Sequence, residues 1–319
     1  MNIDKLIGNT PMIKIDYEYE GKFGSIYTKL EYYNYSGSIK DRIALYILKK
    51  EKENGKLNDG QAIVEVTSGN TGISFSAIGT LFGHDVHIFM PDWVSIERRN
   101  LIEMYGAHVH LVSKEEGGFK KALELAEEFA NETGAYRPLQ FDNKLNVEAQ
   151  YTTTGKEILD AAPHVNAFVS GIGTGGTLMG IGKRLKDNDP NSKIIALEPS
   201  TLSILKMGME EGSHMIEGIG DDFIPGIIEQ DLIDDIVLID DCDAINMSKR
   251  IAKEFGLGIG ISSGANFLAG VLMNSDDLVM ATVFPDDNKK YITTRLSEEI
   301  DDNPELISNR IRLIDFEVI

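Results

Sequence analysis

The chain has 319 residues, 42% of them hydrophobic and 26% charged, which is enough to bury a large core in one or two domains. Its formal net charge of −20 argues against nucleic acid or an anionic membrane as the main partner. The single cysteine, Cys242, lies among aspartates, so the sequence predicts no internal disulfide, no cysteine metal cluster and no reactive thiol. We also predict no other metal site. Because no signal-peptide pattern and no apolar run of about 18 residues is present, we expect a cytoplasmic protein.

Strand and helix patterns alternate along most of the chain. After short strands that extend to residue 30, the first half is predicted to contain helices at 40–48, 70–82, 95–105 and 117–133, and strands at 62–66, 85–90 and 108–112. The second half is predicted to contain helices at 147–161, 178–186 and 265–273, a helix that ends at 255, and strands at 167–170, 193–197, 236–239 and 278–284. This alternation predicts an α/β fold with two lobes, each a mostly parallel sheet flanked by helices, and a cleft between them.

Lys40 lies in the segment 36–42 (Ser-Gly-Ser-Ile-Lys-Asp-Arg), immediately before the apolar stripe of the first predicted helix. This position is the first helical turn, where the positive end of the helix dipole disfavours a cation and lowers the pKa of an amine. A neutral amine is what Schiff-base chemistry requires. An exposed lysine near a helix start is the alternative interpretation of this segment taken alone.

Three turns rich in glycine, serine or threonine lie at the carboxyl ends of predicted strands, where open α/β sheets bind ligands. The first, 67–72 (TSGNTG), offers hydroxyls and an amide beside free helix N–H groups, which suits a carboxylate or a phosphate. The second, 173–177 (GTGGT), can bind a phosphate with backbone amides and threonine hydroxyls. The third, 261–266 (ISSGAN), offers a neutral hydroxyl for a ring nitrogen, although an ordinary helix cap explains it equally well.

The second turn also permits a different interpretation. Residues 171–176 match the dinucleotide-binding spacing Gly-x-Gly-x-x-Gly, and Glu198 follows at a strand end, where such enzymes bind the ribose. An NAD-dependent oxidoreductase is therefore an alternative, but it leaves Lys40 and the turn at 67–72 unexplained.

Together these features resemble the fold-type-II pyridoxal-phosphate (PLP) enzymes of the cysteine synthase (O-acetylserine sulfhydrylase) and cystathionine β-synthase family, which have a tryptophan synthase β-like fold. The similarity extends from 7–11 (IGNTP) to 285–291 (PDDNKKY). It implies pyridoxal 5'-phosphate as the cofactor, a small-molecule amino acid as the substrate, and a homodimer. It also implies a large PLP-binding lobe made of residues 1–41 and 143–319, and a smaller mobile lobe, residues 42–142, that binds the substrate.

The resemblance implies a role for each motif residue. Lys40 would hold PLP as a Schiff base and move the α-proton of the substrate. Asn70 would bind the ring hydroxyl of PLP, and Ser262 would face its pyridine nitrogen, with Ser263 as the alternative. The phosphate would be bound by Gly173, Thr174, Gly175, Gly176 and Thr177. The substrate carboxylate would be bound by Thr67, Ser68, Thr71 and Gln140.

The sequence departs from the family pattern at four places. Three of them are Tyr35 in place of the usual proline, the segment 143–147 with no histidine after it, and the segment 286–290. The fourth is 218–225 (GIGDDFIP), where Asp221 and Asp222 replace two small apolar residues in a loop that borders the active site. If both acids face solvent, they carry no catalytic meaning. An inward-facing carboxylate would activate water, protonate a departing thiol and repel hydrosulfide.

We therefore expect PLP-dependent β-replacement or β-elimination on a C3-substituted amino acid through an aminoacrylate intermediate. The leading hypothesis is that L-cysteine reacts with water, or with a thiol, to give hydrogen sulfide and L-serine, or a thioether. Lys40, Asp221 and Asp222 are the candidate catalytic residues. The alternative is cysteine synthase, which makes L-cysteine from O-acetylserine and sulfide. A catalytically silent binding protein is disfavoured because Lys40 and all three turns are present.

Overall fold

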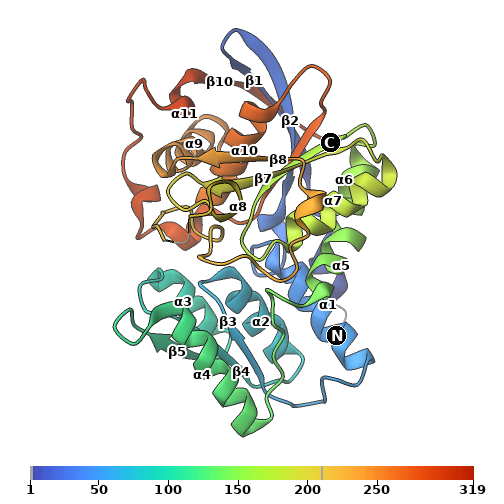
Figure 1. The fold of residues 1–319 in the computed structure, drawn as a ribbon, viewed down its shortest axis with the longest axis vertical. Coiled ribbons are helices and arrows are strands. Elements are labelled where there is room, and N and C mark those ends of the chain that lie inside the picture. The colour runs from blue at the N-terminus through green and yellow to red at the C-terminus, as the bar shows by residue number, and fades with distance from the viewer. Residues whose placement is uncertain (1–2, 210) are drawn as a thin grey trace.

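The larger of two sheets forms the upper lobe in Figure 1. The computed structural model describes residues 3–209 and 211–319. The larger sheet has seven strands. Five of them, β2, β9, β6, β7 and β8, are parallel to one another, whereas β1 runs antiparallel to its two neighbours, β2 and β10. In spatial order the strands are β10 (Ile311–Val318), β1 (Met12–Tyr19), β2 (Lys22–Leu30), β9 (Met280–Phe284), β6 (Ala167–Gly171), β7 (Lys193–Pro199) and β8 (Asp235–Ile239).

The smaller sheet forms the lower lobe and consists of three parallel strands. They are β3 (Ile63–Val66), β4 (Val86–Pro91) and β5 (His108–Val112), in that spatial order. Every residue of β3 is buried, as expected for a strand covered by helices on both faces. Both sheets are therefore mostly parallel, and the predicted α/β fold is confirmed.

Helices pack on both faces of each sheet. Their bounds are α1 (Lys40–Glu53), α2 (Asn70–Leu81), α3 (Ile96–Met104), α4 (Gly118–Thr133), α5 (Lys144–Thr152), α6 (Thr154–Ala161), α7 (Gly176–Asn188), α8 (Ile204–Met207), α9 (Asp241–Phe255), α10 (Ile261–Met273) and α11 (Ile307–Arg310). Short 3-10 turns occur at η1 (Ile3–Leu6), η2 (Glu31–Tyr33), η3 (Gln230–Leu232), η4 (Asn288–Tyr291) and η5 (Arg295–Ser297).

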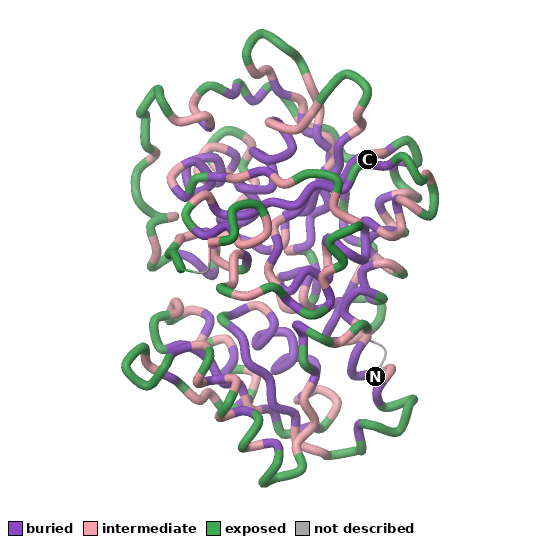
Figure 2. Tube along the Cα trace, viewed as in Figure 1, coloured by how far each residue is buried: buried purple, intermediate pink, exposed green. Residues whose placement is uncertain are grey.

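The period-two pattern of the strands divides the core into layers, which appear as buried segments at the centre of each lobe in Figure 2. In β6, Phe168 packs with α5, α6 and α7 on one face, whereas Val169 packs with α9 and α10 on the other. In β4, Ile88 packs with α1, α2 and α3, whereas Phe89 packs with α4. Each sheet is thus a central layer between two helical layers.

The two lobes are connected by shared packing. Ile3, Ile7 and Ala149, which the sequence assigns to the large lobe, join the same apolar cluster as α1, α2 and β4. The lobe boundaries at 41/42 and 142/143 therefore stay a prediction. Within the described residues, no helix is both long enough and apolar enough to cross a bilayer.

Several elements differ from the sequence-based prediction. The single helix expected at 147–161 is two helices, α5 and α6, which meet at Thr153. The helix expected to begin at residue 265 begins at Ile261. The third predicted turn, 261–266, is therefore the first helical turn of α10. The strand β10 was not predicted, and it extends the larger sheet by pairing with β1.

Candidate active site

The candidate site is a pocket between the two lobes, at the carboxyl ends of β3, β6 and β9. All three sequence-predicted turns reach it, together with Lys40 of α1 and the loop that contains Asp221. Of the predicted site residues, those that line it are Lys40, Thr67, Ser68, Asn70, Thr71, Gln140, Gly173, Thr174, Gly175, Thr177, Asp221 and Ser262. The fold therefore brings together residues that lie far apart in the sequence.

Lys40 is the first residue of α1, as the sequence predicted, and two neighbours fix the start of this helix. The Asp41 carboxylate accepts a hydrogen bond from the backbone N–H of Ser36 at 2.6 Å and another from the Ser36 hydroxyl. The hydroxyl of Ser38 accepts from the Lys40 N–H at 3.2 Å. The segment 36–42 is therefore a rigid support that sets the direction of the lysine.

Arg42, in the same first turn, anchors the helix to two other elements. Its guanidinium pairs with Glu31 at 2.6 Å and with Glu157 of α6 at 2.6 Å, and all three side chains are buried or nearly so. Lys29 of β2 completes the network through Glu157 at 2.8 Å. Two acids and two bases balance in charge, which is what a buried ionic cluster requires.

Burial lowers the pKa of the Lys40 ammonium, and the Asp221 and Asp286 carboxylates oppose this effect. The direction favours a neutral amine, the nucleophilic form. Desolvation is the largest cause, so the sequence argument from the helix dipole identified the correct direction but not the main reason.

The turn at 67–72 presents its polar groups to the pocket from the smaller lobe. Thr71 donates to Gln140 Oε1 at 2.7 Å, and the Gln140 amide donates to the Val66 carbonyl at 2.7 Å. The Thr67 hydroxyl accepts from the Gly69 N–H at 3.0 Å, while Ser68 is exposed to the pocket. These two hydrogen bonds hold the Gln140 side chain in one orientation at the edge of the pocket.

The glycine turn at 173–177 comes between β6 and α7, at a helix N-terminus, where the first N–H groups have no carbonyl partner within the helix. Gly175 has φ of +87°, and a Cβ on Gly173 would lie 2.4 Å from the Gly218 carbonyl oxygen. Gly176 does not line the pocket, because its Cα faces Asn146, whose Oδ1 would lie 1.9 Å from an added Cβ. Only glycine fits at these places, and the backbone and hydroxyl groups of the resulting cradle are donors that suit a phosphate.

Of the two candidate serines, Ser262 lines the pocket, whereas Ser263 is fully buried and does not line it. Asn70 donates to Asp286 Oδ2 at 2.7 Å, and Tyr291 donates to the same oxygen at 2.6 Å. The Asn70 Oδ1 atom is buried with no partner. Because Asn70 lines the pocket, this unpartnered acceptor calls for a donor from a ligand, such as a ring hydroxyl.

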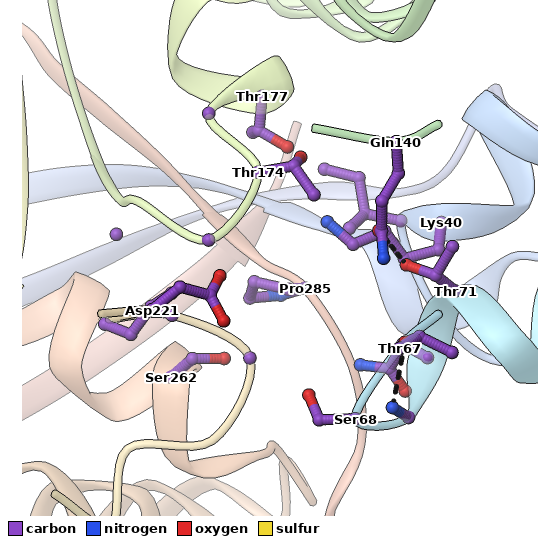
Figure 3. A pocket seen from close by; sticks show the side chains of 18 of the residues that line it. Lys40, Thr67, Ser68, Thr71, Gln140, Thr174, Thr177, Asp221, Ser262 and Pro285 are labelled. Atoms are coloured by element: carbon purple, nitrogen blue, oxygen red, sulfur yellow. Dashed lines mark hydrogen bonds between the residues drawn. The ribbon is translucent and has the colours of Figure 1, made fainter. Parts of the chain in front are cut away.

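The loop that precedes Asp221 is anchored to the glycine turn. Gly218 and Gly220 have φ of +90° and +75°, and the Gly220 N–H donates to the Ile172 carbonyl at 2.8 Å. His214 contacts the Gly220 carbonyl at 2.7 Å. These contacts direct the Asp221 carboxylate into the pocket, which it shares with Lys40 (Figure 3).

Asp221 and Asp222 differ sharply in environment. Asp222 is exposed and does not line the pocket, and the next residue, Phe223, packs against Phe141 with 4.9 Å between ring centres. Burial raises the pKa of Asp221 to about 6, with the Asp222 charge adding to the effect and Lys40 opposing it. Of the two predicted acids, only Asp221 is placed to act on a bound molecule.

Arg98 lines the pocket, and Asp286 and Tyr291 contact residues that line it; the sequence analysis gave none of the three a role. Asp286 links Asn70 to Tyr291, as described above. Arg98 of α3 lines the pocket and pairs with Glu217, and its guanidinium lies 4.7 Å from the centre of the Tyr291 ring. These contacts tie the smaller lobe to the larger one beside the pocket. Asp286 and Tyr291 lie in the segment 285–291 that carries part of the family resemblance, but the sequence did not show their contacts, because each depends on a partner from a distant part of the chain.

Glu198 decides against the dinucleotide alternative. Its carboxylate accepts from the Ser203 hydroxyl at 2.7 Å and from the backbone N–H groups at 204, 205 and 206 at 2.9–3.1 Å. It therefore caps the short helix α8 and has no capacity left for a ribose.

Comparison with known proteins identifies the family. A family model described as "Pyridoxal-phosphate dependent enzyme" matches residues 3–287. The chain belongs to this family of PLP-dependent enzymes. Its cofactor is PLP, and the lysine, the glycine cradle and the unpartnered Asn70 oxygen provide groups that fit the aldehyde, the phosphate and the ring hydroxyl of PLP.

Several PLP-dependent relatives are similar over nearly the whole chain. A cysteine synthase of Staphylococcus aureus is 40% identical over 300 residues, which cover 92% of this chain and 96% of the relative. A crystal structure of a hydrogen sulfide-producing enzyme from Fusobacterium nucleatum is 46% identical, with a TM-score of 0.96, and covers 99% of this chain and 97% of that one. Another structure shows an Asp-to-Asn variant of that enzyme in complex with an alpha-aminoacrylate intermediate, again at 46% identity, TM-score 0.96 and coverage of 99% and 98%.

These similarities establish the class of reaction. The protein is a PLP-dependent enzyme of the cysteine synthase family, and it catalyses β-replacement or β-elimination. When bound, PLP supplies an electron sink for the charge that develops at the substrate Cα.

Proposed function

We propose that this enzyme breaks down L-cysteine by adding water, giving hydrogen sulfide and L-serine. The observation that carries the proposal is the Asp221 carboxylate, which lines the pocket beside Lys40 and is the only acid among the described residues that does so. The hydrogen sulfide-producing relative adds support, because the intermediate in its Asp-to-Asn variant is what loss of a water-activating aspartate would leave behind.

The reaction is balanced and involves no net oxidation. Lys40 takes the proton from Cα, the Cβ–S bond breaks, and the sulfur leaves as hydrosulfide, which takes a proton from solvent to become hydrogen sulfide. Asp221 then takes a proton from a water molecule whose oxygen forms the new bond to Cβ, and releases this proton to solvent. Lys40 returns a proton to Cα. With a pKa of about 6, Asp221 is ionised at neutral pH and is still basic enough to accept this proton.

The other predicted residues have the roles that the family resemblance implied. Lys40 attaches the cofactor, and Asn70 and Ser262 contact its ring. The phosphate is bound by the turn at 173–177. Gly176 does not line the pocket, and its lack of a side chain lets the turn pack closely against Asn146. The substrate carboxylate is bound by the turn at 67–72 and Gln140, whose fixed position supports this role.

Cysteine synthase is the second candidate, supported by the Staphylococcus aureus relative of that name. Synthesis and breakdown of cysteine would use the same pocket residues, and only Asp221 would distinguish the two reactions. An ionised Asp221 repels the hydrosulfide anion that synthesis must admit, so the carboxylate favours breakdown.

The deciding experiment incubates the purified holoenzyme with L-cysteine in water enriched in oxygen-18. We expect sulfide and serine in equal amounts, with the label in the serine hydroxyl. Sulfide with an unlabelled thioether would mean that a thiol replaces water. If cysteine is inert while O-acetylserine and sulfide give cysteine, the enzyme is a cysteine synthase and the role proposed for Asp221 is wrong.

We also propose that residues 42–142 move as the smaller lobe and close over the substrate. The contacts beside the pocket, where Glu97 accepts from Thr293 at 2.8 Å and Arg98 pairs with Glu217, are those that closure would form and opening would break. Trp93, the sole tryptophan, lies just before α3 and reports on this region. A substrate analogue should change its fluorescence and reduce the radius of gyration in X-ray scattering. An unchanged radius would contradict closure.

A cytoplasmic homodimer is the remaining proposal, and it rests mainly on the family resemblance. The edge strand β10 supports it, because Ile314 and Val318 are 40% and 72% exposed there. Such an edge is available for pairing with a second copy. Light scattering should give twice the chain mass of 35.3 kDa, and a value of 35.3 kDa would contradict the dimer.

A further inference from the structure

Four of the six histidines of the chain lie on or beside the smaller sheet, and three of these pack together on β4 and β5. His87 of β4 and His108 of β5 are register partners in the parallel pair, and their rings stack with 4.7 Å between centres. Asp85 lies one residue before β4 and contacts both of them. This cluster is at the amino ends of the strands, whereas the active site is at the carboxyl ends of the two sheets.

The ligand atoms of Asp85, His87 and His108 all lie within 4.8 Å of one another. One carboxylate oxygen is 3.2 Å from His87 Nε2, and the other is 3.0 Å from His108 Nε2. Neighbouring ligands around a tetrahedral zinc ion are about 3.3 Å apart, given Zn–N and Zn–O bonds of about 2.0–2.1 Å. The two spacings to Asp85 therefore already match those around zinc, and the two imidazole nitrogens lie within 4.8 Å of each other.

His110 holds the ring of His87 in the orientation that coordination requires. His87 Nδ1 and His110 Nε2 are 3.0 Å apart, so one of them donates to the other. When His87 Nδ1 carries the proton, its Nε2 lone pair faces Asp85 and is free to bind a cation. His110 is itself stacked on Phe89, with 4.3 Å between ring centres, and is thus fixed from behind.

We propose that Asp85, His87 and His108 form a binding site for a divalent transition-metal ion, with Zn²⁺ as the best match. Two imidazoles and one carboxylate are ligands that zinc accepts, and water completes the tetrahedron because Asp85 and His108 are exposed. The prediction from the sequence that the protein has no metal site considered only cysteine clusters, and it missed this set because the ligands come from two strands.

The site would connect the edge strand β5 to the central strand β4 of the smaller sheet. An ion that binds the folded state and not the unfolded chain stabilises the fold. We therefore assign it a structural role in the smaller lobe, separate from catalysis.

Equilibrium dialysis of the holoenzyme, carrying no histidine tag and kept free of substrate, tests the proposal with Zn²⁺ alone. We expect about one Zn²⁺ per chain at micromolar concentration and a rise in Tm with added Zn²⁺. His108→Ala removes an exposed ligand and should weaken Zn²⁺ binding by about 100-fold or more. This loss is larger than the roughly 10–100-fold that is typical when a residue that only supports a ligand is removed. His110→Phe keeps the stacking but not the hydrogen bond, and it should weaken binding by about 10–100-fold.

Two variants serve as controls. His164→Ala removes an exposed histidine that contacts Tyr27 in the other lobe, and Cys242→Ser removes the only thiol. Both should bind Zn²⁺ as tightly as the unaltered enzyme. The proposal is overturned if the enzyme binds no Zn²⁺ under these conditions, or if His108→Ala binds it as tightly as the unaltered protein does.

Discussion

Replacing Asp221 by asparagine tests the assignment of the base most directly. The amide has the same shape but cannot take a proton from water. General-base catalysis contributes about 10²–10⁴-fold, so the steady rate of sulfide release should fall by that factor. Elimination itself does not need the base, and the variant should still release about one sulfide per active site before it stalls.

The same substitution should stabilise the folded enzyme. Burial raises the pKa of Asp221 from 3.8 to about 6, so its ionised form is disfavoured in the folded state. Each pKa unit corresponds to about 1.4 kcal/mol, which makes the cost of the charge about 3 kcal/mol above pH 6. Below about pH 4 the carboxyl is protonated in both states and the cost disappears. The free energy of unfolding of Asp221→Asn should exceed that of the unaltered enzyme by up to about 3 kcal/mol at pH 8, with little difference at pH 4.

Asp222→Asn is the matched control, because the residue is adjacent, identical in type and exposed. We expect near-normal sulfide release and a change in stability within about 0.5 kcal/mol. Removing its charge should lower the pKa of Asp221 and move the acid limb of the activity profile to lower pH.

Rapid-mixing measurements with L-cysteine would record the sulfide burst and the visible spectrum together, and urea unfolding at pH 4 and pH 8 would record stability. If Asp221→Asn turns over at the normal rate, Asp221 is not the base. If it is slow but no more stable at pH 8, the carboxylate is not held in the buried, raised-pKa state that the proposal requires.

Three further substitutions test other parts of the site. Lys40→Ala should abolish covalent attachment of the cofactor, so borohydride should no longer fix PLP to the chain, and turnover should be lost. Gly173→Ala should lower the affinity for PLP, measured by cofactor titration, because the new Cβ would lie 2.4 Å from the Gly218 carbonyl oxygen and displace the cradle. Arg42→Met should reduce the free energy of unfolding by about 3–5 kcal/mol in urea titrations, because it leaves the buried Glu31 carboxylate without its main partner; a loss below about 1 kcal/mol would contradict this account.

The sequence predicted the elements that carry the chemistry but not the contacts between them. Lys40 at the start of α1 and the turns at 67–72 and 173–177 followed from local spacing, since small polar residues clustered between a strand and a helix are typical of a ligand-binding turn. The break of the long helix at Thr153 was not predicted, because no proline or glycine precedes it. The strand β10 was missed because its pairing with β1 joins the two ends of the chain.

The choice between Asp221 and Asp222 shows why part of the site required the structure. Adjacent residues in a loop point in different directions, and the direction here depends on two positive φ angles and on the contact of Gly220 with Ile172. Those contacts form only when β6 and the loop meet in three dimensions. Comparison with the family pattern identified the unusual pair of acids, and only packing could assign one of them to the pocket.

The order of strands in the larger sheet has a consequence for folding during synthesis. The smaller sheet pairs segments that lie close together in the chain, residues 63–112, and can form as soon as they leave the ribosome. The larger sheet cannot, because β2 pairs with β9 and β1 pairs with β10, from opposite ends of the sequence. Strands β1 and β2 must therefore wait with unpaired edges until β9 and β10 are made, and this interval is when the chain is most exposed to aggregation and most in need of a chaperone.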